Sequence, residues 1–354
     1  MTYNLTAYQS IRHLMIRVPN WVGDAVMAIP AVRAVRENFP AAVITAVARP
    51  WVRAVFRPGE LVDEVIDYDV IGRHRGLLGR LVLIKALRRQ RFDLGVLLQN
   101  AFDAAFLAWG AGIPIRAGFK TDARGMLLTH GVPLPRAVKQ GHQVDYFLYV
   151  IEALGLQVTD RRPSLTPAMA DLAAGKTALA EMGWHDSDLL VGVSPGASFG
   201  PAKRWPADRF GELVRLIKHQ LGAKVVLLGS PGEEATGDAI ARKSGAVDFN
   251  LIGRTDLGVA MAVISQCAAF VANDSGLMHV AGALNVPVVG LFGSTNHLAT
   301  APKTDKLVLV RHALPCSPCK KETCRLNTYD CLNLIQPMEV LAAVDRALSG
   351  RYDI

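Results

Sequence analysis

The chain has 354 residues, 51% hydrophobic and 20% charged, a composition typical of folded globular proteins that excludes a disordered chain. Lys and Arg outnumber Asp and Glu by 39 to 31, and the net charge of +8 favours anionic partners such as phosphates, nucleic acid or an acidic membrane face. No window of about 20 residues is free of charged and polar groups, and the N-terminal segment is too polar for a signal peptide, so we expect a cytoplasmic protein without membrane-spanning helices.

The first half of the chain alternates short apolar runs with helical patterns. Runs rich in Val, Ile and Leu predict buried strands at 13–18, 43–48, 64–68 and 94–100. Apolar residues at helical spacing predict helices near 25–38, 75–91, 101–110 and 141–155. Strands that alternate with helices in this way indicate a parallel sheet covered on both faces.

The second half repeats this alternation. Its apolar runs predict strands at 189–196, 224–230, 268–274 and 286–293. Its helices are predicted near 206–221, 256–266 and 276–284, and a last helix lies between Pro337 and Gly350. The sequence therefore predicts an α/β protein with two doubly wound domains.

A segment without strand character, 159–176, separates the two halves and contains two prolines, which places the boundary near 160–175. The predicted domains are 1–168 and 169–335, followed by the last helix in 336–354. Ligands of doubly wound sheets bind at the carboxyl ends of the strands, so the polar residues that follow each strand are the candidate site residues.

A basic amphipathic helix is predicted in 71–91, a stretch that contains no acidic residue. Leucines and isoleucines recur near helical spacing at 77, 78, 81, 84 and 87. The face is either simply solvated or contacts anionic lipid headgroups or a phosphorylated ligand. The arginines that are candidates for such contacts are Arg73, Arg75, Arg80 and Arg88.

Gly23 and Asp24 follow the first strand and open a helix. An Asp at this point is either the helix N-cap or a catalytic base, and the residues alone leave both roles open. Neither half carries GxGxxG after its first strand, which disfavours a dehydrogenase.

The loop after strand 189–196 reads SPGASFGPAKRWP, and its prolines and glycines keep it exposed and irregular. Ser198 and Lys203 supply a hydroxyl and a cation that suit a phosphate, although a surface turn with incidental charges is the alternative. The loop lacks GxxxxGK[ST], so it is not a P-loop.

Two more strand ends carry polar groups. Glu233 follows strand 224–230, where an acid can hold a ribose diol or simply favour the next helix through its dipole. Asp274, Ser275 and Gly276 follow strand 268–274 at a helix start, where free N–H groups attract a diphosphate. His279 lies one turn later on the side of Ser275 and can donate to a phosphate oxygen.

Four of the five cysteines gather near the C-terminus, at Cys316, Cys319, Cys324 and Cys331. This spacing leaves three interpretations open: a structural zinc, a redox role, or local structural thiols. The second pair does not have the spacing of a standard zinc ribbon.

Taken together, three motifs resemble the lipopolysaccharide heptosyltransferases of glycosyltransferase family 9. They are NWVGD at 20–24, PGASFGPAKRWP at 195–206 and NDSGLMHVAGALNVP at 273–287, and the resemblance covers nearly the whole chain. It implies a GT-B fold, in which two Rossmann-like domains face a cleft and the C-terminal helix crosses back to the first domain. The donor, ADP-L-glycero-D-manno-heptose, would bind the C-terminal domain, and a phosphorylated lipid A-core acceptor would bind the N-terminal one.

The resemblance also implies roles for individual residues. Asp24 would be the base that deprotonates the acceptor hydroxyl. On the donor side, Lys203 would contact the diphosphate with Ser198 nearby, Glu233 the ribose and Asp274 a heptose hydroxyl. Thr255 would lie by the adenine, and Ser275, Gly276 and His279 around the phosphates.

The implied reaction is an inverting transfer to the inner core that needs no obligatory cofactor and no nucleic-acid partner, and the motifs favour the second core heptose. Peripheral contact with the cytoplasmic face of the inner membrane would follow from the lipid acceptor and the basic helix. The alternatives are another GT-B sugar-nucleotide enzyme, such as a transferase for the first heptose, a UDP-sugar transferase or an epimerase, and a non-catalytic nucleotide-binding regulator.

Overall fold

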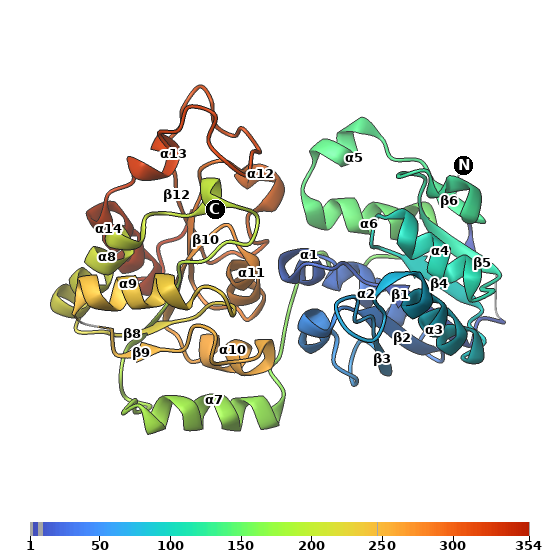
Figure 1. Cartoon of the computed structure of the whole chain (residues 1–354), viewed down its shortest axis with the longest axis horizontal. Coiled ribbons are helices and arrows are strands. Elements are labelled where there is room, and N and C mark those ends of the chain that lie inside the picture. Colours follow the sequence, from blue (N-terminus) through green and yellow to red (C-terminus); the bar gives the residue numbers. More distant parts are fainter. Residues whose placement is uncertain (1–2, 6–9, 246, 354) are drawn as a thin grey trace. The chain divides into compact units, whose positions relative to one another are not determined.

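The computed structural model describes residues 3–5, 10–245 and 247–353. They form two compact units, Met1–Pro163 and Ser164–Ile354 (Figure 1), so the division lies inside the segment 160–175. Within the described ranges, no helix combines the length and apolarity needed to span a bilayer.

The first unit is built on a parallel sheet of six strands in the order β3-β2-β1-β4-β5-β6. The strands are β1 (His13–Arg17), β2 (Val43–Ala48), β3 (Glu64–Asp67), β4 (Leu94–Leu97), β5 (Ile115–Phe119) and β6 (His130–Val132). The first four match the predicted runs. The last two were not predicted: β6 is a three-residue edge strand, and β5 contains a glycine and Arg116, which interrupt its apolar pattern.

The helices of the first unit differ from the prediction mainly at its start. They are α1 (Val22–Met27), α2 (Ile29–Asn38), η2 (Pro50–Phe56), α3 (Gly76–Arg89), α4 (Phe102–Gly110), η3 (Arg124–Leu127), α5 (Arg136–Gln140) and α6 (Gln143–Ala153). The single helix predicted at 25–38 is two helices because Ala28 ends α1 and Pro30, which has no N–H to donate, lies in the first turn of α2.

The second unit has another parallel six-stranded sheet, in the order β12-β11-β10-β7-β8-β9. The strands are β7 (Leu190–Ser194), β8 (Lys224–Leu227), β9 (Phe249–Asn250), β10 (Ala269–Asn273), β11 (Val288–Leu291) and β12 (Leu307–Val310). The four central strands match the predicted runs, and the two edge strands were missed.

Four of its α-helices were not predicted: α7, α9 and the two four-residue helices α12 and α13. The full set is α7 (Met169–Glu181), η4 (Pro201–Lys203), α8 (Ala207–Leu221), α9 (Glu234–Ser244), α10 (Leu257–Ile264), α11 (Gly276–Ala283), α12 (His297–Thr300), α13 (Asp330–Asn333) and α14 (Pro337–Leu348). Part of the predicted linker is thus helical, since α7 begins at Met169 and packs against α10.

Both units have the same topology. Numbered within its own unit, each sheet has the order 3-2-1-4-5-6, the doubly wound order of Rossmann folds. This confirms the predicted α/β class with two Rossmann-like parallel sheets. In such sheets the strand order reverses between the first and fourth strands, and ligands bind there. The switch points are β1/β4 in the first unit and β7/β10 in the second.

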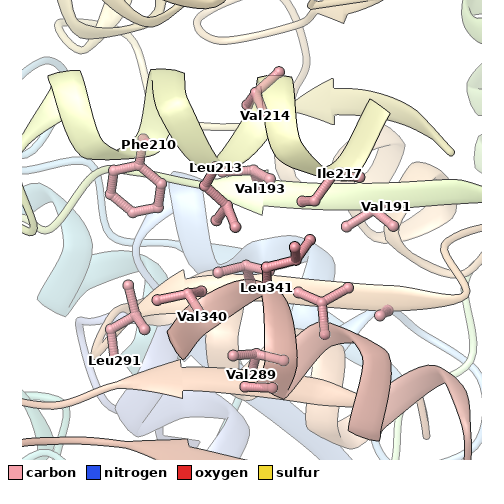
Figure 2. Packing of buried hydrophobic residues seen from close by; sticks show 14 of the residues in the cluster. Val191, Val193, Phe210, Leu213, Val214, Ile217, Val289, Leu291, Val340 and Leu341 are labelled. Carbon is pink, nitrogen blue, oxygen red and sulfur yellow. The ribbon is translucent and has the colours of Figure 1, made fainter. Parts of the chain in front are cut away.

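The core of the second unit lies between its sheet and two helices (Figure 2). Alternate residues of β7 and β11, such as Val191 and Val289, point toward Leu213 of α8 and Val340 of α14, and all four are fully buried. Residues of opposite parity face α11, where the sulfur of Met278 lies 3.4 Å from where a Cβ on Gly290 would be. The sheet is therefore covered on both faces, which leaves its carboxyl edge for polar groups.

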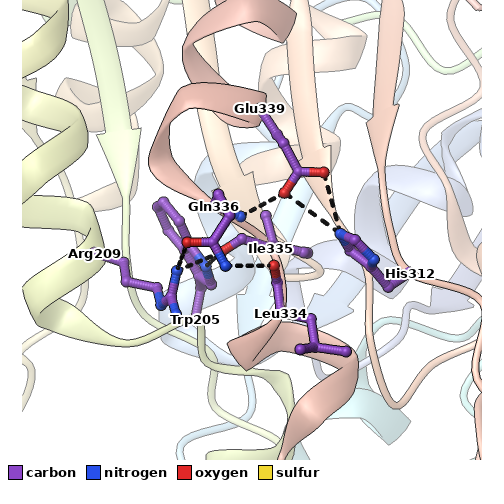
Figure 3. Close-up of polar contacts among 7 residues, drawn as sticks. All are labelled: Trp205, Arg209, His312, Leu334, Ile335, Gln336 and Glu339. Atoms are coloured by element: carbon purple, nitrogen blue, oxygen red, sulfur yellow. Dashed lines mark hydrogen bonds and ion pairs between the residues drawn. The ribbon is translucent and has the colours of Figure 1, made fainter.

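The last helix, α14, uses its apolar face inside the second unit, packing on α8 and β12. Its start is tied down by polar contacts (Figure 3): the indole N–H of Trp205 and a guanidinium N–H of Arg209 both donate to the carbonyl of Ile335. Glu339 accepts from the backbone N–H of Gln336 and pairs with His312. This packing was not expected, because the resemblance implied a helix that crosses back to the first domain; that crossing stays a prediction.

Candidate functional site

The loop 195–205, which contains Lys203, is held at both ends by one buried side chain. Asn273, the last residue of β10, donates its Nδ2 to the carbonyl of Pro195 (2.7 Å) and accepts from the N–H of Trp205 (3.1 Å). Because β7 and β10 are the neighbours at the switch point, this clamp fixes the loop where a ligand is expected. The sequence analysis gave Asn273 no role, although an amide at the end of a fully buried strand is a signal for one.

Lys203 and Asp274 meet at this strand end. The Lys203 ammonium lies 2.9 Å from Oδ2 of Asp274 and 5.0 Å from the centre of the Phe199 ring. His279 Nε2 is 3.9 Å from Oδ1 of the same carboxylate, and the hydroxyl of Thr300 donates to Oδ2 at 3.4 Å. The structure thus brings together three predicted residues and adds Thr300, a residue of α12 that the sequence did not indicate.

The start of α11 carries hydrogen-bond donors that can bind an anion. Ser275 is its N-cap residue, but the serine side chain makes no capping hydrogen bond, and its buried hydroxyl has no partner among the residues that the structure describes. Gly276 is the first helical residue and has no side chain, so a ligand can approach the backbone closely at that position. The free N–H groups of this turn and the unpartnered hydroxyl can all donate to one negatively charged group.

Two more unpartnered hydroxyls follow β11, those of Ser294 and Thr295. β10 and β11 pair in parallel with Asn273 opposite Leu291, so the residues after both strands lie at the same edge of the sheet. Buried hydroxyls normally have hydrogen-bond partners, and those at this edge are therefore candidates for donating to a ligand. The sequence analysis missed both residues, since Ser and Thr after a strand are common in turns.

Glu233 lies at the same carboxyl edge of the sheet, in the segment after β8, the strand that pairs with β7. It lies at the N-cap position of α9, but its carboxylate accepts from the N–H and hydroxyl of Ser230 (2.8 and 2.9 Å). Gly196 lies directly beneath this side chain: a Cβ built there would be 1.9 Å from Glu233 Oε1. The carboxylate and the loop 195–205 are therefore in contact.

The other two predicted donor residues are less defined. Ser198 is exposed, and Thr255 is half-buried immediately before Asp256, whose side chain caps α10. In the described part of the chain, neither hydroxyl has a hydrogen-bond partner that would place it with Lys203 and Asp274.

Asp24 of the first unit is not an N-cap. The N-cap of α1 is Trp21, and Asp24 is the third helical residue, half-buried at the carboxyl end of β1. It is close enough to Tyr146 for their charges to interact: burial raises the pKa of Tyr146 to about 12, and the charges of Asp122 and Asp24 contribute. Of the two roles left open by the sequence, the cap is therefore wrong, because the helix begins two residues before Asp24.

The loop before Asp24 is held by two arginines that the sequence analysis missed, one buried and one half-buried. Arg17, fully buried at the end of β1, donates to Asn20 Oδ1 (2.5 Å), and Arg49 donates to the same oxygen (3.1 Å). Both guanidinium groups lie over the ring of Tyr68. Burial lowers the pKa of Arg17 to about 9, and the positive charge of Arg49 adds to this effect. The N–H of Asn20 donates to Gln99, which ties the loop to the end of β4.

The four arginines predicted on the basic helix differ in their contacts and exposure. Arg80 pairs with Asp103 at 2.8 Å and donates to the hydroxyl of Tyr68, while 40% of its side chain stays exposed, so its contact with a lipid headgroup stays a prediction. Arg88 donates to the carbonyl of Gly110. Arg73 and Arg75 are exposed just before α3.

The zinc interpretation of the four cysteines is not supported, because the described residues contain no group of three or more His, Cys, Asp or Glu that could hold a metal ion. Backbone N–H groups of residues 326–329 face the sulfur of Cys324 and lower its pKa. Burial raises the pKa of Cys331 to about 11, and the charges of the other three thiols add to this. The segment instead supports the loop 195–205, since the carbonyl of Glu322 accepts from the N–H of Ala202 (2.9 Å).

Comparisons with known proteins give a consistent result for the chain as a whole. The family model for glycosyltransferase family 9 (heptosyltransferase) matches residues 80–330. Lipooligosaccharide heptosyltransferase 2 of Haemophilus ducreyi is 32% identical over 84% of this chain and 88% of its own. Lipopolysaccharide heptosyltransferase 2 of Escherichia coli is 30% identical over 95% of this chain and 98% of its own. The solved structure of Escherichia coli ADP-heptose lipopolysaccharide heptosyltransferase II superimposes with a TM-score of 0.80 at 28% identity, covering 96% of this chain and 99% of that one.

Proposed function

The chain belongs to glycosyltransferase family 9, the heptosyltransferase family, and we propose that it transfers heptose from ADP-L-glycero-D-manno-heptose to the inner core of lipopolysaccharide. The product would carry the second core heptose, added to heptosyl-Kdo2-lipid A, in line with the names of the relatives that are 30% or more identical. The observation that carries the proposal is the start of α11, where an uncapped helix and an unpartnered hydroxyl follow directly on the Lys203–Asp274 pair.

The donor would bind at the carboxyl edge of the second sheet. Lys203 and the N–H groups at Gly276 supply positive charge for the diphosphate, with Ser275 and His279 as further donors and Ser198 nearby. Asp274, fixed by Lys203, would accept from a heptose hydroxyl. Glu233 would accept from the ribose diol, and Thr255 would lie beside the adenine.

The transfer itself would use Asp24 as the base. As the acceptor oxygen attacks the anomeric carbon, its proton moves to the Asp24 carboxylate, while the bond from that carbon to the diphosphate oxygen breaks on the opposite side of the sugar. The negative charge that develops on ADP is stabilised by Lys203 and the start of α11. This route uses the chain's own groups and needs no cofactor besides the sugar nucleotide.

The test is transfer from ADP-heptose to defined core acceptors that carry zero or one heptose. We expect product with the one-heptose acceptor and much less with the other. A donor panel of ADP-heptose, UDP-GlcNAc and GDP-mannose distinguishes this activity from that of another sugar-nucleotide enzyme. Inertness on both acceptors with all three donors would contradict the proposal.

Because the proposed acceptor is a lipid, we also propose that the protein works in the cytoplasm at the inner-membrane surface. The net charge of +8 supports this, since that surface is rich in anionic lipids. The exposed arginines before α3, Arg73 and Arg75, would take part in that contact.

A further inference from the structure

Helix α3 has two apolar faces, and only one of them is buried. Leu83, Ile84 and Leu87 pack into the first unit. Leu77 and Leu78 are 62% and 79% exposed, and Leu81 and Val82 are exposed as well. The apolar pattern that the sequence suggested was one stripe is therefore divided, and the outward half has no partner among the described residues.

Cations continue this outward face toward the end of the helix. Leu78, Val82, Lys85 and Arg89 follow one another at intervals of three or four residues and are all exposed, so they share one side of α3. The first two turns of that side are apolar and the last turns are basic. Arg80, which pairs with Asp103, is on the other side of the helix.

A groove of about 650 Å³ lies along this basic part of the helix. Its polar lining includes Arg53, Asp67, Asp69, Arg73, Lys85 and Arg89. Both acids are already engaged: Asp67 pairs with Arg53 at 3.1 Å, and Asp69 accepts from the N–H groups of residues 71–73. Arg73, Lys85 and Arg89 make no ion pair within the described ranges, so the groove retains uncompensated positive charge.

We propose that α3 docks on an anionic bilayer, with its exposed leucines in the acyl boundary and a lipid phosphate headgroup in the adjacent groove. A bilayer surface presents phosphates and hydrocarbon within a few ångströms of each other, which matches a helix face that is apolar at one end and basic at the other. A nucleic acid would satisfy the cations but leave the leucines in water. This surface deepens the proposed function, since it would hold the enzyme where a lipid acceptor is found.

The experiment is flotation of the full chain with vesicles of phosphatidylcholine alone or mixed with phosphatidylglycerol. The chain should float with the mixed vesicles and not with the neutral ones. Two double variants change exposed residues only, Leu77→Ser with Leu78→Ser and Lys85→Ala with Arg89→Ala. Each should weaken partitioning by about tenfold or more, because each removes apolar contact or charge worth at least about 1.4 kcal/mol.

Matched controls carry the same kinds of change elsewhere. Met169→Ser removes an exposed apolar side chain of the second unit, and Arg215→Ala with Arg242→Ala removes two exposed charges. Both controls should float like the unmodified chain. Equal flotation of the α3 variants and the controls, equal binding to neutral vesicles, or no vesicle binding by the unmodified chain would each overturn the proposal.

Activity on a water-soluble acceptor fragment separates this inference from the proposed function. The leucine variant should keep its turnover on that fragment while it loses flotation. If the unmodified chain floats but transfers no heptose to any acceptor, the function fails and the membrane surface stands.

Discussion

Asp274 shows how side chains at the candidate site hold one another in position. Its almost fully buried carboxylate accepts hydrogen bonds from the Lys203 ammonium and the Thr300 hydroxyl and lies 3.9 Å from His279. A buried carboxylate is tolerated when it is paired in this way, and the pair is positioned before any ligand arrives. The residue that performs the proposed chemistry, Asp24, is by contrast half-buried, as a base that must meet a substrate should be.

Replacing Asp24 by Asn should remove the base while keeping the shape of the side chain. We expect kcat to fall about 100-fold to 10,000-fold, the usual contribution of general base catalysis, while the affinity for ADP stays the same. Steady-state transfer assays and calorimetric titration with ADP measure the two quantities. A variant that retains its kcat would exclude Asp24 as the base, and one that lost ADP affinity would point to a structural role.

At the scale of elements, the candidate site residues follow the ends of strands, whereas the strand interiors form the apolar core. Eight strands were predicted from runs of Val, Ile and Leu; seven lie inside the sheets, where a strand buried on both faces is apolar along its length, and the eighth is the edge strand β3. β6 and β9 were missed because they are edge strands of only three and two residues, and β5 because Gly118 and Arg116 interrupt it. The edge strand β12 was also missed, although its four residues are all apolar. None of the missed strands carries a proposed donor residue.

The clamp that Asn273 forms between β10 and the loop 195–205 can be tested by substitution. Asn273→Ala leaves the carbonyl of Pro195 and the N–H of Trp205 buried without their partner, which should cost about 2 kcal/mol of unfolding free energy. Because the loop carries Lys203, we also expect weaker ADP binding. Urea unfolding and ADP titration measure the two effects.

Asn38→Ala is the matched control, since the Asn38 amide also bridges backbone groups, but in the first unit: it donates to the carbonyls of Ala34 and Gln157 and accepts from the N–H of Gln157. It should lower stability while leaving the affinity for ADP unchanged. If both variants bind ADP as tightly as the unmodified chain, the clamp does not position the donor loop.

Over the whole molecule, two sheets with one topology carry different polar edges. The first has the arginine pair Arg17 and Arg49 with Asp24 after β1, and the second has the Lys203–Asp274 pair together with the hydroxyls after β10 and β11 that have no partner among the described residues. Under the proposed function the same fold would serve two roles, because the residues of the loops after the strands, and not the strands, determine the chemistry.

Assigning the donor site to the second unit predicts which segments ADP stabilises when it binds. At 100 times its dissociation constant, ADP should stabilise the unit that binds it by about 2.7 kcal/mol. In hydrogen exchange read by mass spectrometry, we expect slower exchange in 195–206, 229–233 and 273–279, with the first sheet unchanged. Protection confined to the first unit would contradict the assignment of the donor site.

Local patterns were sufficient to predict the α/β class, the two domains, the central strands and the motifs that carry the family resemblance. They succeed because buried parallel strands must be apolar, and because turns and helix starts restrict residue type. Contacts between residues far apart in the chain followed only from the fold: Asn273 with Pro195, Glu233 with Gly196, Arg17 with Arg49 through Asn20. The same holds for the two faces of α3, since residue spacing defines an apolar stripe, but the packing of neighbouring elements decides which side of it is buried.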